Sequence, residues 1–166
     1  MVTLEQFSSE QTRAVVSNSA WRVFLQDAAW LGMSAETRCS ILGDVSEPLY
    51  ESWMKAADVH FNRDQLDRIV LLHAIRERLE KLFGCANAAA EWLCAEHSEK
   101  DPVFGGRSPI EHVMHEGMIG LYHILTRLEK MMEDITSALA GWEDDESDDL
   151  MWKSEDAANT RPRLLH

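Results

Sequence analysis

The chain has 166 residues, 45% of them hydrophobic, and its 29 acidic and 16 basic side chains give a formal net charge of -13. This length and apolar content suffice for a hydrophobic core, and without an apolar run of about 18 residues we expect neither a membrane span nor a signal peptide. The excess of carboxylates repels phosphate backbones and favours a basic protein partner, and we expect a cytoplasmic protein.

The cysteines are three in number and show no CxxC spacing. Such a set is typical of reduced thiols in a cytosolic core, rather than of a disulfide framework or a zinc site. We therefore predict that Cys39, Cys85 and Cys94 are packing residues.

The N-terminal third is predicted to be helical after an irregular start. Residues 1–20 are rich in Ser, Thr and Gln and are predicted to form a flexible arm or one short helix. Over 21–31 the apolar side chains recur every three or four positions, which predicts an amphipathic helix. A short helix capped by Ser34 should follow over 35–42, and another should begin at Ser46. The expected buried residues of this last helix are Leu49, Trp53 and Met54.

A longer helix is predicted next. Asn62 and Gln65 have the spacing of a capping box, which marks the start of a helix over 63–83, and Gly84 ends it. An alanine-rich helix over 85–97 follows, with a tryptophan and a leucine as its large side chains. The long helix carries one wide apolar stripe, made of Leu66, Ile69, Leu72, Ile75, Leu79 and Leu82.

The last helical region begins after a loop at 97–107 that contains proline and glycine. Ser108, followed by a proline and then a glutamate at the third position, predicts a helix start. We expect an interruption near Gly117, after which a helix resumes and ends at Gly141. Its apolar stripe is either buried core or a surface for self-association or a partner. The stripe comprises Met118, Leu121, Leu125, Leu128, Met132, Ile135 and Leu139.

No alternating strand pattern and no internal repeat is present, so the predicted fold class is all-α. We divide the chain into an arm or short helix at 1–20, a helix-turn-helix-like module at 21–61, a helical domain at 62–140 and an acidic tail at 141–166. Six carboxylates within 143–149 make the tail either a solvated segment or a contact for a basic cleft.

Several motifs follow one another between residues 66 and 131. A helix that ends Leu-Glu-Lys-Leu-Phe at 79–83 is followed by Glu-Trp-Leu at 91–93 and by Asp-Pro-Val-Phe-Gly-Gly-Arg-Ser-Pro-Ile-Glu at 101–111. A glycine followed by an aliphatic-rich helix at 117–128 is the last of these motifs. The order of the motifs along the chain resembles the toxin-binding domain of the Xre/MbcA/ParS antitoxin family. The resemblance implies a helix-turn-helix-like N-terminal region joined to a helical domain that binds a RES-domain toxin.

A weaker resemblance to the family's N-terminal module covers residues 41–56. It departs from a DNA-reading pattern, because Glu47, Pro48 and Glu51 stand where arginine, lysine, glutamine or asparagine would contact bases. Carboxylates facing phosphates would be repelled, so operator binding through this helix is doubtful. The DNA contacts, if the module makes any, would be Ser46, Tyr50 and Lys55.

The partner-binding surface implied by the resemblance lies in the C-terminal half. It comprises Phe104, Gly105, Gly106, Arg107, Ser108, Pro109, His112, His115 and Tyr122. Two other interpretations stay open: a phosphate-binding loop at 105–107, and a metal site formed by acidic and histidine side chains within 111–116. Neither region has the spacing of a known nucleotide or metal motif. His73 and His123 are predicted to be core or groove residues with a partnered ring nitrogen.

The leading hypothesis is a binding protein without catalytic residues or cofactor. The resemblance implies an antitoxin that covers the active site of its toxin, and a toxin that consumes NAD or uses NAD to ADP-ribosylate a target. The antitoxin could act as a homodimer or within a toxin–antitoxin hetero-oligomer. An autorepressing DNA-binding regulator is the alternative, and a metal-dependent helical enzyme is a third reading. A pocket that binds the NAD pyrophosphate needs cationic residues, which an acidic inhibitor complements.

Overall fold

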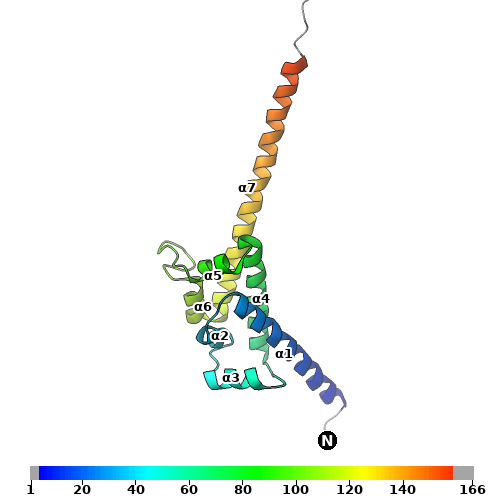
Figure 1. Cartoon of the computed structure of the whole chain (residues 1–166), viewed down its shortest axis with the longest axis vertical. Helices are drawn as coiled ribbons and strands as arrows, with labels where there is room; N and C mark the ends of the chain where they lie inside the picture. The colour runs from blue at the N-terminus through cyan, green and yellow to red at the C-terminus, as the bar shows by residue number, and fades with distance from the viewer. Residues whose placement is uncertain (1–3, 159–166) are drawn as a thin grey trace, which may run out of the picture. The chain divides into compact units, whose positions relative to one another are not determined.

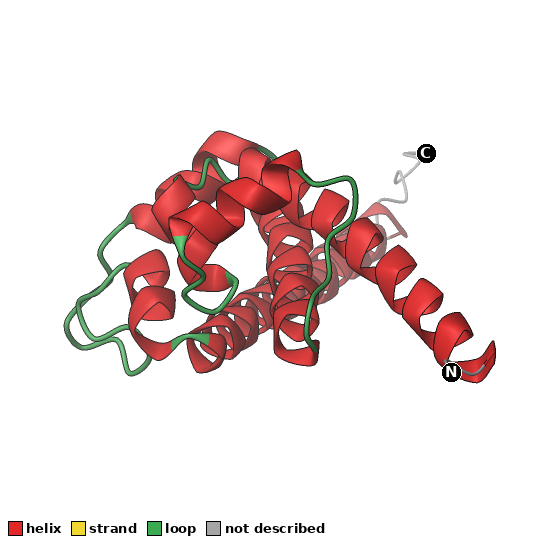
Figure 2. Ribbon diagram, turned by 90° about the horizontal axis from the view of Figure 1, so that it is seen from below, coloured by secondary structure: helices red, strands yellow, loops and turns green. Residues whose placement is uncertain are grey.

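The computed structural model describes the backbone of residues 4–158 and the side chains of residues 12–141. Over the described residues the chain forms seven α-helices and no strand, which confirms the all-α prediction (Figure 2). Two compact units are present, Met1–Leu128 and Glu129–His166. None of the helices in the described part has an apolar stretch long enough to cross a membrane.

The first three helices are α1 (Leu4–Trp30), α2 (Ala35–Ile41) and α3 (Glu47–Lys55) (Figure 1). The rings of α1 and α3 form an aromatic cluster with Phe61. The Trp21 ring centroid lies 5.6 Å from those of both Phe24 and Tyr50, and the Trp53 and Phe61 rings are 5.2 Å apart. The predicted cap of α2 is confirmed, because the Thr37 amide donates a hydrogen bond to the Ser34 hydroxyl.

The predicted inward face of α3 is wrong in part. Leu49 and Met54 are exposed, whereas Tyr50 is buried and Trp53 is half-buried. The reason is that α3 packs on α1 through its aromatic side chains, which bury more area than Leu49 and Met54 would and contact Trp21 directly.

The long helix α4 (Arg63–Phe83) begins with the predicted capping box between Asn62 and Gln65 and ends at Gly84 in a left-handed conformation. Its apolar stripe faces the core, with Ile69, Leu72, Ile75 and Leu79 buried, and α1 packs against it. The connection that precedes α4 is held to α1, since the Phe61 amide donates to the Ser17 hydroxyl and the Val59 amide to the Asn18 side chain.

The remaining helices are α5 (Ala86–Cys94), α6 (Pro109–Glu116) and α7 (Met118–Ala158). Gly117 separates α6 from α7 with φ 60° and ψ -127°, a conformation that glycine adopts at no steric cost, so the predicted interruption is confirmed. A Cβ atom on Gly120 would lie 2.8 Å from Val113 Cα. Glycine is therefore required where the two helices approach.

The apolar stripe of α7 divides at the boundary between the two units. Leu121 and Leu128 are fully buried, whereas Ile135 is 49% and Leu139 57% exposed. The stripe is therefore core in the first unit and surface in the second. The predicted helix end at Gly141 is wrong, because a single glycine costs about 1 kcal/mol in a helix and does not by itself stop one. The side chains of the acidic run at 143–149 lie outside the described side chains.

The prediction that all three cysteines are packing residues is confirmed for only one of them. Cys39 is buried as expected, but Cys85 and Cys94 are exposed thiols at the two ends of α5. Cys85 is the N-cap residue and Cys94 the last residue of α5, so both lie at the ends of the helix, where fewer neighbours cover them.

Candidate functional site

The turn between α5 and α6 is held in shape by Asp101. One of its carboxylate oxygens accepts hydrogen bonds from the Val103 and Phe104 amides at 2.8 and 3.0 Å, and the other pairs with Arg127 of α7 at 3.1 Å. The Phe104 amide, with further help from the Val103 amide and the Arg127 guanidinium, holds the pKa of Asp101 below its usual value. The carboxylate is therefore ionised at neutral pH and ties the turn to α7.

Phe104 anchors the same turn from the inside. Its ring is buried and contacts the rings of Trp92, His97 and His112. The following Gly105 and Gly106 both have positive φ, and a Cβ on Gly106 would lie 3.3 Å from Glu99 Cγ. The aromatic anchor and the two glycines together turn the chain so that Arg107 is exposed.

The start of α6 is capped as the sequence predicts. The Ser108 hydroxyl accepts a hydrogen bond from the Glu111 amide, and the Glu111 carboxylate accepts one from the Ser108 amide at 3.0 Å. The hydrogen bonds that the Ser108 amide and hydroxyl donate to the Glu111 carboxylate lower the pKa of Glu111. The Glu111 side chain is therefore occupied by the cap, which leaves it poorly suited to hold a metal.

The nine predicted partner-binding residues fall into two groups. Five lie at the surface or partly so, and their side chains or backbone are open to a partner: Gly105, Gly106, Arg107, His115 and Tyr122. The other four are buried, and they act by positioning the first group: Phe104, Ser108, Pro109 and His112. The predicted set of partner-binding residues therefore includes both surface residues and buried residues that support them.

Large apolar side chains are exposed on the same two helices. Met114 of α6 is exposed, and Ile119 and Tyr122 of α7, one helical turn apart, are 59% and 51% exposed. Sequence reasoning included Tyr122 but missed Met114 and Ile119. Periodicity does not reveal their exposure, because α6 and α7 carry apolar residues on both their buried and their exposed faces.

His112 and His123 join α6 to α7 through their rings, with His112 Nε2 and His123 Nδ1 2.9 Å apart. Burial, and then the neighbouring His123, lower the pKa of His112, so its ring is neutral at pH 7. Among the described residues no three His, Cys, Asp or Glu side chains converge in a way that would hold a metal ion.

The residues considered for DNA contact do not share one surface. Ser46 is exposed, Tyr50 is buried against Trp21, and Lys55 pairs with Glu51 at 3.5 Å. A buried tyrosine and a paired lysine leave little for a phosphate or a base to contact.

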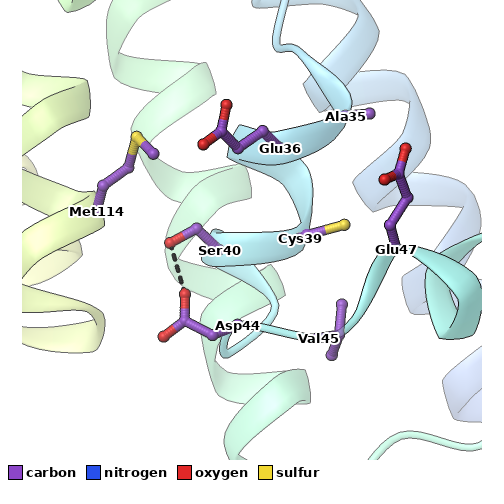
Figure 3. A pocket seen from close by; sticks show the side chains of 8 residues that line it. All are labelled: Ala35, Glu36, Cys39, Ser40, Asp44, Val45, Glu47 and Met114. Carbon is purple, nitrogen blue, oxygen red and sulfur yellow. Dashed lines mark hydrogen bonds between the residues drawn. The ribbon is translucent and has the colours of Figure 1, made fainter.

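A groove on the outer side of α2, which we call the α2 groove, was not predicted. It has a volume of about 580 Å³ and is lined by Glu36, Cys39, Asp44, Val45, Glu47 and Met114, among others (Figure 3). Figure 3 shows Met114 and Asp44 on one side of α2, and Cys39 and Glu47 on the other. Met114 reaches the groove only because α6 packs against α2, a contact that no sequence spacing indicates.

A second cavity, of about 430 Å³, lies between α1 and α4 beside the buried Asp27. The Asp27 carboxylate accepts a hydrogen bond from His73 Nδ1 at 2.9 Å, and its other oxygen lies 3.8 Å from Arg76 Nε. The Arg76 guanidinium also lies over the Trp30 ring and pairs with Glu80. His73 and His123 both have a partnered ring nitrogen, as predicted, and His73 lines this cavity, but His123 is exposed and is not a core residue. The charges of Asp27 and Arg76 are paired, although Arg76 Nε makes no hydrogen bond within the described residues, and this pairing links α1 to α4.

Compared with the known protein families and with curated proteins, the chain matches none of them.

Proposed function

We propose that this protein is a non-catalytic binding protein of antitoxin type, and that it neutralises a RES-domain toxin by covering the toxin's NAD site. The observation that carries the proposal is the anchored turn that exposes Arg107 next to the helix pair α6 and α7, whose exposed side chains include Met114, Ile119 and Tyr122.

Such a surface has the composition of a protein interface. Tyrosine, methionine and arginine are enriched where proteins bind one another, and a cluster of exposed apolar side chains on a monomer marks such sites. The turn is also rigid before binding, because Asp101, Phe104 and the Ser108 cap already determine its shape. Little conformational entropy is then lost when a partner binds.

The toxin class comes from the resemblance in residues 66–131. The charge supports it, because a site that binds the NAD pyrophosphate is cationic and this chain carries a net charge of -13. Opposite charges raise the rate of encounter and favour the correct partner.

The proposal is tested with the RES-domain toxin encoded in the same genome. Calorimetry gives the dissociation constant, and NAD turnover gives the inhibition. Arg107→Ala and Tyr122→Ala should each weaken binding by about 1 to 3 kcal/mol. The matched controls are Arg63→Ala and Val70→Ala, which remove an exposed arginine and an exposed apolar side chain from α4.

Equal affinity for the test and control variants would place the interface elsewhere on the molecule. Failure of the full chain to bind or inhibit any such toxin would refute the proposed function itself. Inhibition should also weaken as salt rises, since the screening length falls to about 8 Å at physiological ionic strength and further above it.

A further inference from the structure

The α2 groove has both apolar and acidic side chains in its lining. The apolar ones are Cys39, Val45 and Met114, and the acidic ones come from three consecutive segments, Glu36, Asp44 and Glu47. Its volume of about 580 Å³ is within the range of roughly 300 to 1,000 Å³ that is usual for ligand sites. It is therefore large enough for an amino-acid side chain together with some of its backbone.

No ion pair within the described residues involves the three carboxylates of the groove. By contrast, Asp64 pairs with Arg68 and Asp101 pairs with Arg127. For Glu36, Asp44 and Glu47 the described part of the chain provides only a hydrogen bond, from the Ser40 hydroxyl to Asp44 at 2.9 Å. Three unpaired negative charges thus surround one groove.

Local effects explain why two of these carboxylates are tolerated, but not why all three meet. Glu36 and Glu47 each lie in the first turn of a helix, where the helix dipole stabilises a negative charge. Asp44 has a left-handed backbone with φ 54°, which turns the chain between the two helices. The packing of α6 then adds Met114 to the same groove.

The two sulfur atoms of the lining are neutral. Burial, and then the carboxylate of Glu47, raise the pKa of the Cys39 thiol, so the sulfur is uncharged at neutral pH. The Met114 thioether is polarizable and adapts to the shape of a guest. Apolar side chains beside carboxylates suit a side chain with an aliphatic stem and a cationic end.

We propose that the α2 groove binds an arginine or lysine side chain from a basic segment of a partner protein. The methylene stem would lie on apolar side chains of the lining, such as Cys39 and Val45, and the cationic end would face the carboxylates of the groove. Guanidinium and ammonium groups both form charge-assisted hydrogen bonds with carboxylates. This inference goes beyond the proposed function, because it does not require the partner to be a toxin.

The test uses the full chain and two blocked pentapeptides, acetyl-Ala-Arg-Ala-Arg-Ala-amide and the same peptide with citrulline in place of arginine. Citrulline keeps the shape of arginine and removes its charge. Amide shifts in ¹⁵N spectra should move within 35–47 and around Met114. The arginine peptide should bind with a dissociation constant on the order of 1 mM or tighter, and the citrulline peptide about tenfold more weakly.

A variant with Glu36→Gln, Asp44→Asn and Glu47→Gln should lose about tenfold in affinity for the arginine peptide, which corresponds to 1.4 kcal/mol. The matched control carries Glu91→Gln, Glu96→Gln and Glu133→Gln, three exposed acids outside the groove. It removes the same total charge and should change the affinity by less than about twofold.

Asparagine at position 44 keeps a side-chain acceptor and tolerates the left-handed backbone, so the triple variant should fold. If it does not, the single Glu36→Gln variant should still weaken binding about threefold, since it removes one exposed charge. Equal losses in the groove and control variants, shifts spread evenly over the acidic surface, equal binding of the citrulline peptide, or no binding at about 10 mM peptide would each overturn the proposal.

Discussion

The two tyrosines of this chain lie on helix pairs with opposite surfaces. Tyr50 of α3 is 6% exposed, whereas Tyr122 of α7 is 51% exposed. The pair α2 and α3 directs its aromatic side chains inward and its carboxylates outward. The pair α6 and α7 buries histidine and valine and leaves tyrosine, methionine and isoleucine at the surface.

The difference shows how packing partners decide which side chains are left for binding. The aromatic side chains of α3 pack against the Trp21 ring of α1, so they are not available at the surface for a partner. Between α6 and α7, Gly120 allows the two backbones to approach closely. The buried face of α7 is formed by Leu121, Ile124 and Leu128, and Ile119 and Tyr122 lie on its exposed face, on a surface suited to a protein partner.

The largest effect should separate the two tyrosines directly. Tyr50→Ala should lower the free energy of unfolding by about 3 to 5 kcal/mol, because it removes a buried ring. Tyr122→Ala should change it by no more than about 0.5 kcal/mol, as expected at the surface. Urea unfolding measures both, and equal losses would contradict the assignment of one tyrosine to the core.

A second variant isolates the ring from the hydroxyl. The Tyr50 hydroxyl is buried and has no hydrogen-bond partner in the described part of the chain. Tyr50→Phe should therefore leave stability unchanged or raise it by about 1 kcal/mol, since an unsatisfied buried group is costly. A clear destabilisation would mean that the hydroxyl does have a partner.

Next in size is the approach between α6 and α7. Gly120→Ala should cost about 1 to 3 kcal/mol, because the new methyl group overlaps the backbone of α6 and this outweighs the helix propensity of alanine. Gly141→Ala, in the open part of α7, has no atom within 4 Å and should be neutral or stabilising. Thermal unfolding distinguishes the two variants, and similar midpoints would contradict the close packing at Gly120.

A smaller, pH-dependent effect is expected at the same helix pair. The pKa of His112 is lowered below its ordinary 6.5, mainly by burial, so the unfolded chain takes up this proton more readily than the folded chain. The stability contributed by neutral His112 is present above that value and is lost as the pH falls below it. His112→Gln should reduce the decrease in unfolding free energy between pH 7.5 and 5.5, whereas His60→Gln, at an exposed ring, should not.

The smallest expected signal is DNA binding by the pair α2 and α3. With Glu47 and Glu51 on α3 and Tyr50 buried, only weak, non-specific retention at low salt is expected, with a dissociation constant on the order of 10⁻⁴ to 10⁻⁶ M. Fluorescence anisotropy with the chain's own upstream region measures it. Nanomolar binding that depends on sequence would favour the alternative function of an autorepressing regulator.

Most of the capped helix ends are features of this structure that the sequence determined by itself. In contrast, the start of α1 at Leu4 and the continuation of α7 past Gly141 differ from the predicted boundaries at 21 and 141. The capping boxes at Asn62 and Ser108, the cap at Ser34 and the glycine ends at positions 84 and 117 were all predicted, and the structure contains them. Each depends on bonds between residues at most four positions apart, or on a backbone conformation that glycine favours. Local chemistry of this kind is readable without knowing the fold.

Only the tertiary structure decided which helix faces are buried and which side chains meet. The α7 stripe has one spacing throughout, yet Leu128 is core and Leu139 is exposed, because neighbours cover only its first part. Met114 joins Cys39 and Asp44 in the α2 groove from far along the chain. Periodicity identifies an apolar face, but burial depends on what packs against that face, and these contacts join residues that the sequence keeps apart.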